Sequence, residues 1–361
     1  MRSHFWLLLF FAGNFFPADA SEKKLIEFGW DEPDTAFMRK HIAEMEKTPF
    51  DGCIFHANYI KPDGSAGMFL WECWGTNTFT EAQFKSALED LRATPFKKFK
   101  QNFLRFNVAP GNVDWFDDFS SILQNAQLTA KIARDGKCAG ILFDIEQYNS
   151  PLFRYHAQRD AKTKSWELYA TKTRQRGREV MEAFQKGFPG GKIFLTFGYS
   201  LPWANSESGK KSLAEVDYGL LAPFLDGMVE AAKEKKSIID GCELAYSFKD
   251  TGLFKHWHKV MRDELLPIVA EPKKYHDAMS LGFGIWMDYD WRKLGWETND
   301  LKKNFYTPEA FEASVREGLK VADEFVWIYT ETPKWWTGKG TEKLPQAYVE
   351  ALQRARTKVA K

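Results

Sequence analysis

Eight apolar runs with the composition of β-strands recur along this chain, and a polar loop follows each of them. Helical patterns separate most of the runs, so strands and helices alternate. Strands that alternate with helices form parallel sheets, and eight such units are the number that closes a (β/α)₈ barrel. The runs span residues 25–32, 51–58, 101–108, 138–147, 192–200, 224–231, 279–288 and 324–331.

The segments between the runs carry helix signals. Residues 35–47 place apolar side chains on a 3.6-residue period, and Thr307-Pro308-Glu309 combines a capping residue with proline at the first helical position. No Gly-rich phosphate turn follows an early strand, which argues against the competing doubly wound sheet. We predict an α/β fold, a single-domain (β/α)₈ TIM barrel. Residues 237–248 fit none of the eight units and are expected to form a loop insertion over the barrel mouth.

The N-terminus has the pattern of a secretory signal peptide. Arg2 precedes an apolar stretch at 5–16, and Ala18-Asp19-Ala20 before Ser21 has the form of a cleavage site. The apolar stretch is too short for a mature membrane span. We therefore expect residues 1–20 to be removed, residues 21–361 to form the barrel domain, and the protein to be secreted or periplasmic. A retained N-terminal anchor is the alternative.

Charge and cysteine usage exclude several classes of partner. The chain has 50 basic and 49 acidic residues without a charge block, which argues against nucleic-acid and membrane-surface partners. The cysteines lack the C-x-x-C spacing of a structural zinc site, and their disulfide state stays open. No serine-nucleophile elbow, phosphate loop or dinucleotide motif is present, so no cofactor or metal is expected. The cysteines are Cys53, Cys73, Cys138 and Cys242.

Several predicted strands end in acidic and aromatic residues. In parallel barrels the carboxyl ends of all strands meet at one face, which carries the active site. Tryptophans beside Gly- or Pro-containing loops add amphipathic rings at that face, and sugars stack on such rings. We predict a carbohydrate cleft whose substrate contacts come from Trp30, Asp31, Tyr199, Glu230, Trp286, Asp288 and Trp335.

The fourth run places two carboxyl groups close together. Successive side chains of a strand alternate between faces, so Asp144 and Glu146 share one face. At about 3.3 Å per residue their Cβ atoms would lie roughly 6.6 Å apart. One ionised group at that distance raises the pKa of the other, which is an arrangement suited to acid–base chemistry if the strand end opens into a cleft.

The segment GILFDIEQY at 140–148 resembles the fourth-strand signature of the chitinase-like family 18 glycosidases, Asp-Gly-apolar-Asp-apolar-Asp-apolar-Glu. Ala139 and Leu142 stand where that family has its first two aspartates. The resemblance implies a barrel glycoside hydrolase, and in its full form it implies that Asp144 orients a substrate acetamido group that acts as nucleophile. Because Leu142 interrupts the pattern, a mechanism with two protein carboxylates stays open. The matching residues are Gly140, Ile141, Phe143, Asp144, Ile145 and Glu146.

Glycoside hydrolysis needs a carboxylic acid to protonate the leaving oxygen. We assign that acid to Glu146, since it lies nearest the mouth and an ionised Asp144 would raise its pKa. Glu331 is the expected second carboxylate, with Asp288 or Glu230 as alternatives.

The expected substrate is an oligosaccharide or polysaccharide, and the expected activity is that of an exported O-glycosyl hydrolase. A non-catalytic carbohydrate-binding barrel and an exported polysaccharide lyase or esterase on the same scaffold are the alternatives. A lyase acting on uronates predicts a basic cleft, whereas the predicted strand ends are acidic.

Overall fold

A computed structural model describes residues 23–357, so the predicted signal peptide at 1–20 lies outside the described residues. Nine parallel strands form one sheet in the order β10-β11-β1-β2-β5-β6-β7-β8-β9. The strands are β1 (Lys24–Gly29), β2 (Gly52–Phe55), β5 (Phe103–Asn107), β6 (Gly140–Asp144), β7 (Lys192–Leu195), β8 (Ile238–Asp240), β9 (Met279–Leu281), β10 (Phe283–Trp286) and β11 (Phe325–Thr330).

The two edge strands of this sheet together occupy one position in the ring, and we call each such strand position of the barrel a stave. Only Gly282 separates β9 from β10; β9 pairs with β8, and β10 pairs with β11. The ring therefore has eight staves, which confirms the predicted (β/α)₈ fold. A small hairpin, β3 (Asn58–Ile60) and β4 (Ala66–Met68), leaves the ring after β2 and brings Met68 to the mouth of the barrel.

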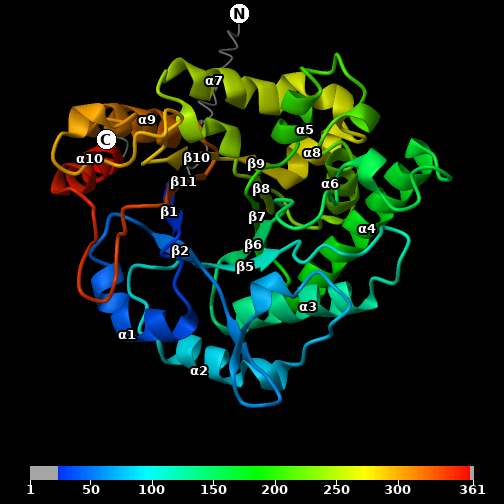
Figure 1. The fold of residues 1–361 in the computed structure, drawn as a ribbon, viewed down its shortest axis with the longest axis horizontal. Coiled ribbons are helices and arrows are strands. Elements are labelled where there is room, and N and C mark those ends of the chain that lie inside the picture. Colours follow the sequence, from blue (N-terminus) through cyan, green and yellow to red (C-terminus); the bar gives the residue numbers. More distant parts are fainter. Residues whose placement is uncertain (1–22, 358–361) are drawn as a thin grey trace, which may run out of the picture.

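Helices surround the ring of strands, as Figure 1 shows. Apolar side chains fill the space between the two layers, while a smaller set that includes Phe103, Leu142 and Phe194 packs inside the barrel. The helices are α1 (Thr35–Met45), α2 (Lys85–Ala93), α3 (Ser120–Asp135), α4 (Trp166–Gly187), α5 (Ser200–Asn205), α6 (Leu221–Ala231), α7 (Gly252–Lys259), α8 (Pro272–Ala278), α9 (Pro308–Val321) and α10 (Gln346–Thr357). Within residues 23–357, no helix has the length and apolarity to cross a membrane.

The sixth predicted strand is wrong. Residues 224–231 lie in α6, and the sixth stave is β8, which falls inside the segment 237–248 that was expected to be a loop insertion. Residues 221–229 of α6 are all buried, so the helix has no polar stripe to reveal its period. The three residues of β8 make a correspondingly weak strand signal.

Helices α4 and α6 touch through two glycines. A Cβ atom on Gly177 would lie 1.9 Å from the carbonyl oxygen of Phe224, and a Cβ atom on Gly227 would lie 1.9 Å from the carbonyl oxygen of Arg174. Backbone lies against backbone at both points, so neither helix can accept a side chain there without moving. This close approach holds α6 against the barrel beside β7 and β8.

We expect Gly177→Ala to lower the free energy of unfolding by about 1–3 kcal/mol or more, because the added methyl group forces the two helices apart. Urea denaturation monitored by circular dichroism measures the change. Thr171→Ala, on the exposed side of the same helix, is the control and should change stability by less than about 0.5 kcal/mol. Equal effects of the two substitutions would contradict the contact.

Candidate active site

A cavity of about 590 Å³ opens at the carboxyl ends of the staves. Its lining combines aromatic rings with several carboxyl groups, and the lining residues come from the ends of all eight staves and from the β3–β4 hairpin region. The polar and aromatic side chains of the lining are Phe28, Trp30, Glu32, His56, Trp71, Arg105, Glu146, Tyr148, Thr196, Glu243, Tyr246, Trp286, Tyr329 and Glu331.

The guanidinium of Arg105, from β5, binds two carboxylates at the floor of the cavity. Its Nη1 lies 2.6 Å from Oε2 of Glu32, and its Nη2 lies 2.6 Å from Oδ2 of Asp144. Its Nε also donates to Oδ2 of Asp144 at 3.1 Å. The guanidinium carbon stands 5.1 Å from the ring centroid of Phe28. These contacts join three staves, β1, β5 and β6.

Asp144 is fully buried and does not line the cavity. Its Oδ2 accepts from Arg105 and from the Tyr148 hydroxyl at 3.0 Å, and its Oδ1 accepts from the backbone N–H of Glu146 at 3.1 Å. Strand β6 ends at Asp144, and the chain then turns. Asp144 therefore sits below Glu146 and fixes the backbone that carries it.

Glu146 reaches the cavity at the end of β6. Burial, followed by the nearby charge of Asp144, raises the pKa of Glu146, while Tyr148 and Arg105 oppose the increase. A carboxyl group with a raised pKa inside a cavity is suited to acid–base work.

Glu243, which the sequence analysis did not select, faces the same cavity from the loop after β8. Burial raises the pKa of Glu243 to about 8, and the charge of Glu146 is the next largest cause. Cys242 precedes it in the left-handed conformation with φ 42°. Its backbone N–H donates to Oδ1 of the buried Asp240 at 2.9 Å, which fixes this unusual turn. Glu243 follows the three-residue strand β8 by three residues, and the prediction of the sixth strand at 224–231 points to Glu230 instead.

Glu331 and Trp286 line the cavity at the ends of β11 and β10. Asp288 lies behind them, buried, where it accepts from the Trp286 indole at 2.9 Å and from the backbone N–H groups of Glu331 and Thr332. Asp288 is thus a support for the cavity wall. Burial, then the charge of Asp288, raises the pKa of Glu331.

Aromatic rings form one wall of the cavity. Tyr246 and Tyr329 stack with ring centroids 5.4 Å apart at 18°, and Trp286 meets Tyr329 edge-on at 5.4 Å. The exposed Trp30 donates from its indole to the Tyr329 hydroxyl at 2.6 Å. Across the cavity, Trp71 lies edge-on to Tyr148 at 5.4 Å. These rings supply the amphipathic surface that the sequence predicted, although Tyr246, Tyr329 and Trp71 were not among the selected residues.

Besides Asp144 and Asp288, four selected residues lie outside the lining of this cavity. Asp31 is directed into the wall, where it accepts from the backbone N–H of Trp335 at 2.9 Å. Tyr199 is buried and donates to Asp226 at 2.8 Å. Glu230 lies on α6 and pairs with Arg174 and Arg178.

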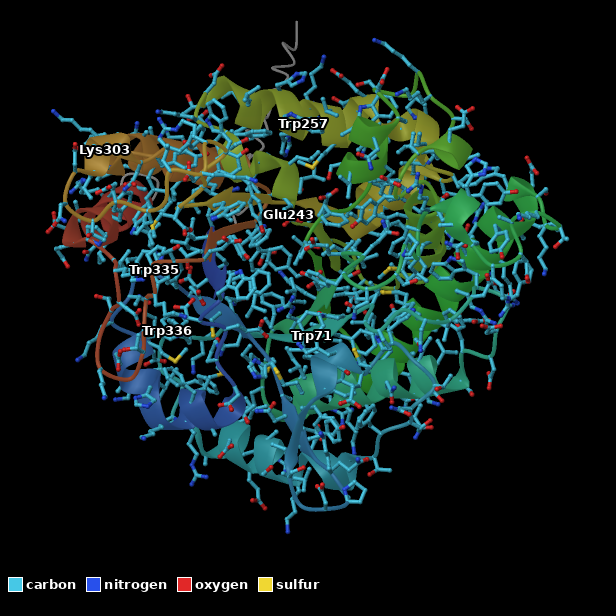
Figure 2. All side chains as sticks on the ribbon, viewed as in Figure 1. Trp71, Glu243, Trp257, Lys303, Trp335 and Trp336 are labelled. Carbon is cyan, nitrogen blue, oxygen red and sulfur yellow. The ribbon has the colours of Figure 1, made fainter. Side chains whose placement is uncertain are left out.

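The fourth of these residues is Trp335. Trp335 and Trp336 are both buried, and Trp335 packs edge-on against Phe50 at 4.8 Å. Figure 2 places both tryptophans toward α1, away from Glu243. Strand-end position alone did not distinguish side chains that face the mouth from those that face the surrounding helices.

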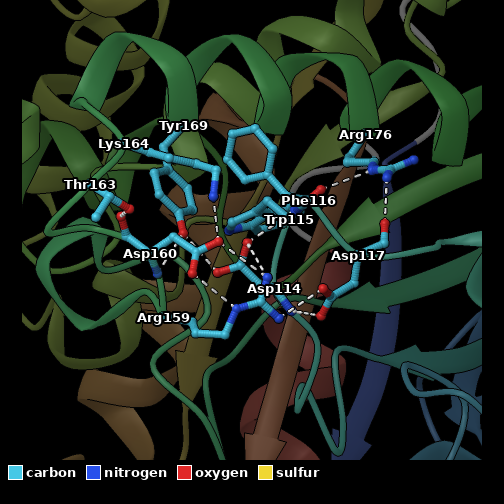
Figure 3. A network of polar contacts seen from close by, with 10 residues as sticks. All are labelled: Asp114, Trp115, Phe116, Asp117, Arg159, Asp160, Thr163, Lys164, Tyr169 and Arg176. Atoms are coloured by element: carbon cyan, nitrogen blue, oxygen red, sulfur yellow. Dashed lines mark hydrogen bonds and ion pairs between the residues drawn. The ribbon is translucent and has the colours of Figure 1, made fainter.

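A polar network fixes the loop between β6 and α4, which follows Glu146 (Figure 3). The Tyr169 hydroxyl donates to Asp114 at 2.8 Å and accepts from the backbone N–H of Asp160 at 3.1 Å. Arg159 pairs with Asp117 at 2.8 Å. The loop is therefore tied to α4 and to the segment before α3.

In the part of the chain that the structure describes, no group of three or more His, Cys, Asp or Glu residues is placed to hold a metal ion. All four cysteines are buried free thiols, which answers the open question of their pairing.

Comparison with known proteins finds no matching family model and no matching curated protein. The fold is similar to that of GH5_18 from Streptomyces cattleya in complex with GlcNAc, with 11% identity, 94% of this chain and 81% of that chain covered, and a TM-score of 0.49. It is also similar to an endocellulase from Pyrococcus horikoshii in complex with cellotetraose, with 12% identity, coverage of 93% and 92%, and a TM-score of 0.45. It is similar as well to a GH5-4 broad specificity endoglucanase from Clostridium acetobutylicum, with 9% identity, 94% of this chain and 97% of that chain covered, and a TM-score of 0.46. Similarity at this level assigns neither a family nor an activity.

We expect the protonated Glu243 to stabilise the fold in a pH-dependent way. In the unfolded chain its carboxyl group ionises near its ordinary pKa of 4.5, whereas the folded protein holds the proton up to a pKa of about 8. Between pH 4.5 and about 8 the folded state binds more protons than the unfolded state. The stabilisation is therefore complete below pH 4.5 and is lost as the pH rises to about 8. Glu243→Gln cannot ionise, and its melting temperature should rise relative to wild type between pH 5 and 8. Glu89→Gln, at an exposed position of α2, is the control, and parallel pH profiles for all three proteins would contradict the assignment.

We expect Arg105→Gln to lower the free energy of unfolding by about 3–5 kcal/mol, because it leaves the buried Asp144 charge unpaired. Asp144→Asn in the same chain should recover part of this loss, since the unpaired charge is then removed. A double-mutant cycle by urea denaturation measures the coupling. Strictly additive losses would show that the two groups do not support each other.

Proposed function

We propose that this protein is an exported glycoside hydrolase in which Glu146 and Glu243 form the catalytic carboxyl pair. The observation that carries the proposal is the placement of two interacting carboxyl groups in one aromatic-lined cavity, with the pKa of Glu243 raised to about 8. Glycoside hydrolysis uses one protonated and one ionised carboxyl group, and environments that separate the two pKa values create that pair.

Glu243 is the proton donor in this proposal. A group with a pKa of about 8 carries its proton at neutral pH, as a general acid must. Glu146 is the ionised partner in this proposal: burial and Asp144 raise its pKa, but the Tyr148 hydroxyl and the Arg105 guanidinium oppose the increase and favour its charged form. It acts on the anomeric carbon directly or through a water molecule. The sequence-based assignment, with Glu146 as the donor, is the alternative arrangement of the same pair.

The contacts of Asp144 favour two protein carboxylates over a substrate-assisted route of the family 18 type. Both of its oxygens accept hydrogen bonds within the protein, from Arg105, Tyr148 and the backbone of Glu146, and the side chain is fully buried. A carboxylate engaged in this way has no free oxygen to orient a substrate acetamido group. Asp144 is therefore proposed to position Glu146 and Arg105.

The charge of the lining favours a hydrolase over a lyase acting on uronates. The cavity carries Glu32, Glu146, Glu243 and Glu331, whereas Arg105 is already paired with acidic groups. Such a lining repels an anionic sugar. The signal-peptide pattern at 1–20 supports export to the periplasm or the cell exterior, where oligosaccharides and polysaccharides are the proposed substrates.

Both Glu146→Gln and Glu243→Gln should reduce turnover of a natural glycan by on the order of 10²–10⁴, because each removes a carboxyl group that the reaction needs. Release of reducing sugar from a panel of polysaccharides measures the loss, with Glu89→Gln as the control. If either variant retains wild-type turnover, the pair is wrongly assigned, and Glu331 becomes the next candidate.

Aryl glycosides with good leaving groups should distinguish the two roles. Such substrates need little protonation, so the variant that lacks the proton donor regains much of its activity on them. We expect this rescue for Glu243→Gln and not for Glu146→Gln, measured by release of the aryl alcohol. The reverse pattern would return the donor role to Glu146.

A further inference from the structure

A third carboxyl group, Glu331, remains in the cavity after the proposed reaction has used Glu146 and Glu243. No Lys, Arg or His of the described residues forms an ion pair with Glu331, whose carboxylate accepts from the Tyr329 hydroxyl at 3.4 Å and also interacts with the Trp30 indole. The basic side chains of the cavity lining are Arg105 and His56, and both face Glu32, at 2.6 and 3.4 Å. The cavity therefore offers negative charge that the protein itself does not neutralise.

The aromatic wall lies between Glu331 and Glu243. Tyr329 carries the contact to Glu331, while Tyr246, stacked on Tyr329 at 5.4 Å, interacts with Glu243. Trp286 stands edge-on to both tyrosines, at 5.6 and 5.4 Å. Two carboxyl groups thus flank a continuous set of three electron-rich rings, all of which line the cavity.

We propose that this wall and Glu331 form a subsite for the ammonium group of an amino sugar. The inference rests on the proposed function and specifies its substrate class: glycans that contain a sugar with a free amino group. A cation is attracted to the faces of Trp and Tyr rings, and a carboxylate adds a charge-assisted hydrogen bond. A hydroxyl or acetamido group carries no positive charge, so it lacks both the attraction to the ring faces and the charge-assisted hydrogen bond. A uronate is repelled by Glu331 and Glu146.

Equilibrium binding of three monosaccharides tests the subsite. Because these sugars have no glycosidic linkage to cleave, the result does not depend on catalytic turnover or on the linkage that the enzyme prefers. Glucosamine, glucose and N-acetylglucosamine differ only at C2, where they carry an ammonium, a hydroxyl and an acetamido group. Titration of the mature protein near pH 6, followed by tryptophan fluorescence and calorimetry, should give a Kd for glucosamine about ten- to a hundredfold lower than for the other two. This preference should weaken as salt is added. Equal Kd values, or tighter binding of glucose or N-acetylglucosamine, would overturn the proposal.

Glu331→Gln tests the named residue. It keeps the shape of the side chain and removes its charge, so the Kd for glucosamine should rise about tenfold or more, and by a larger factor than the Kd for glucose. Glu342→Gln is the matched control, an exposed glutamate outside this cavity, and should leave the preference for glucosamine as in wild type. Equal loss in both variants would show a general charge effect and would overturn the subsite.

Failure of this inference differs from failure of the proposed function. If glycosides are hydrolysed and Glu146→Gln abolishes the activity, but the three sugars bind alike, the hydrolase stands and the amino-sugar subsite is wrong. If glucosamine binds selectively through Glu331 but no glycoside is hydrolysed, the subsite stands as a binding site and the proposed reaction is wrong.

Discussion

The ion pairs of Arg105 hold the mouth of this barrel together. One buried guanidinium bridges Glu32 from β1 and Asp144 from β6, and it rests on the ring of Phe28. A buried charge is tolerated only when it is paired and hydrogen-bonded, so these groups must keep fixed positions. Asp144 in turn binds the backbone of Glu146. The rigidity of the site therefore begins one layer below the residues that face a substrate.

Desolvation acts differently on the two carboxyl groups of the proposed catalytic pair. Burial and the charge of Asp144 raise the pKa of Glu146, but Tyr148 and Arg105 oppose the increase. Glu243 is held by the left-handed turn at Cys242 in a more buried position, and its pKa is raised to about 8. The surroundings of Glu243 therefore hold its proton to a pKa of about 8, while those of Glu146 include two groups that oppose the increase in its pKa, and such a difference between two carboxyl groups suits acid–base chemistry.

Much of the fold followed from patterns that local physics sets. Seven of the eight predicted runs contain staves, and the capping signal at Thr307 precedes α9, where its side chain accepts from the backbone N–H of Ala310. The error at 224–231 has a physical cause, because a helix that is buried on all sides has the same composition as a buried strand. Once β8 was misplaced, Glu230 was selected instead of Glu243.

The amino-acid sequence by itself determined the alternation of strands and helices, and it determined that acids and aromatic rings follow the strands, since both are properties of neighbouring residues. Only the tertiary structure decided which of these side chains meet. Asp31, Tyr199 and Trp335 also follow strands, yet they turn toward the helix layer, while Glu146, Glu243 and Glu331 turn into one cavity. The reason is geometric: strand twist and the turn after each strand set the direction of a side chain at the mouth, and the charges it then faces come from staves far apart in the sequence.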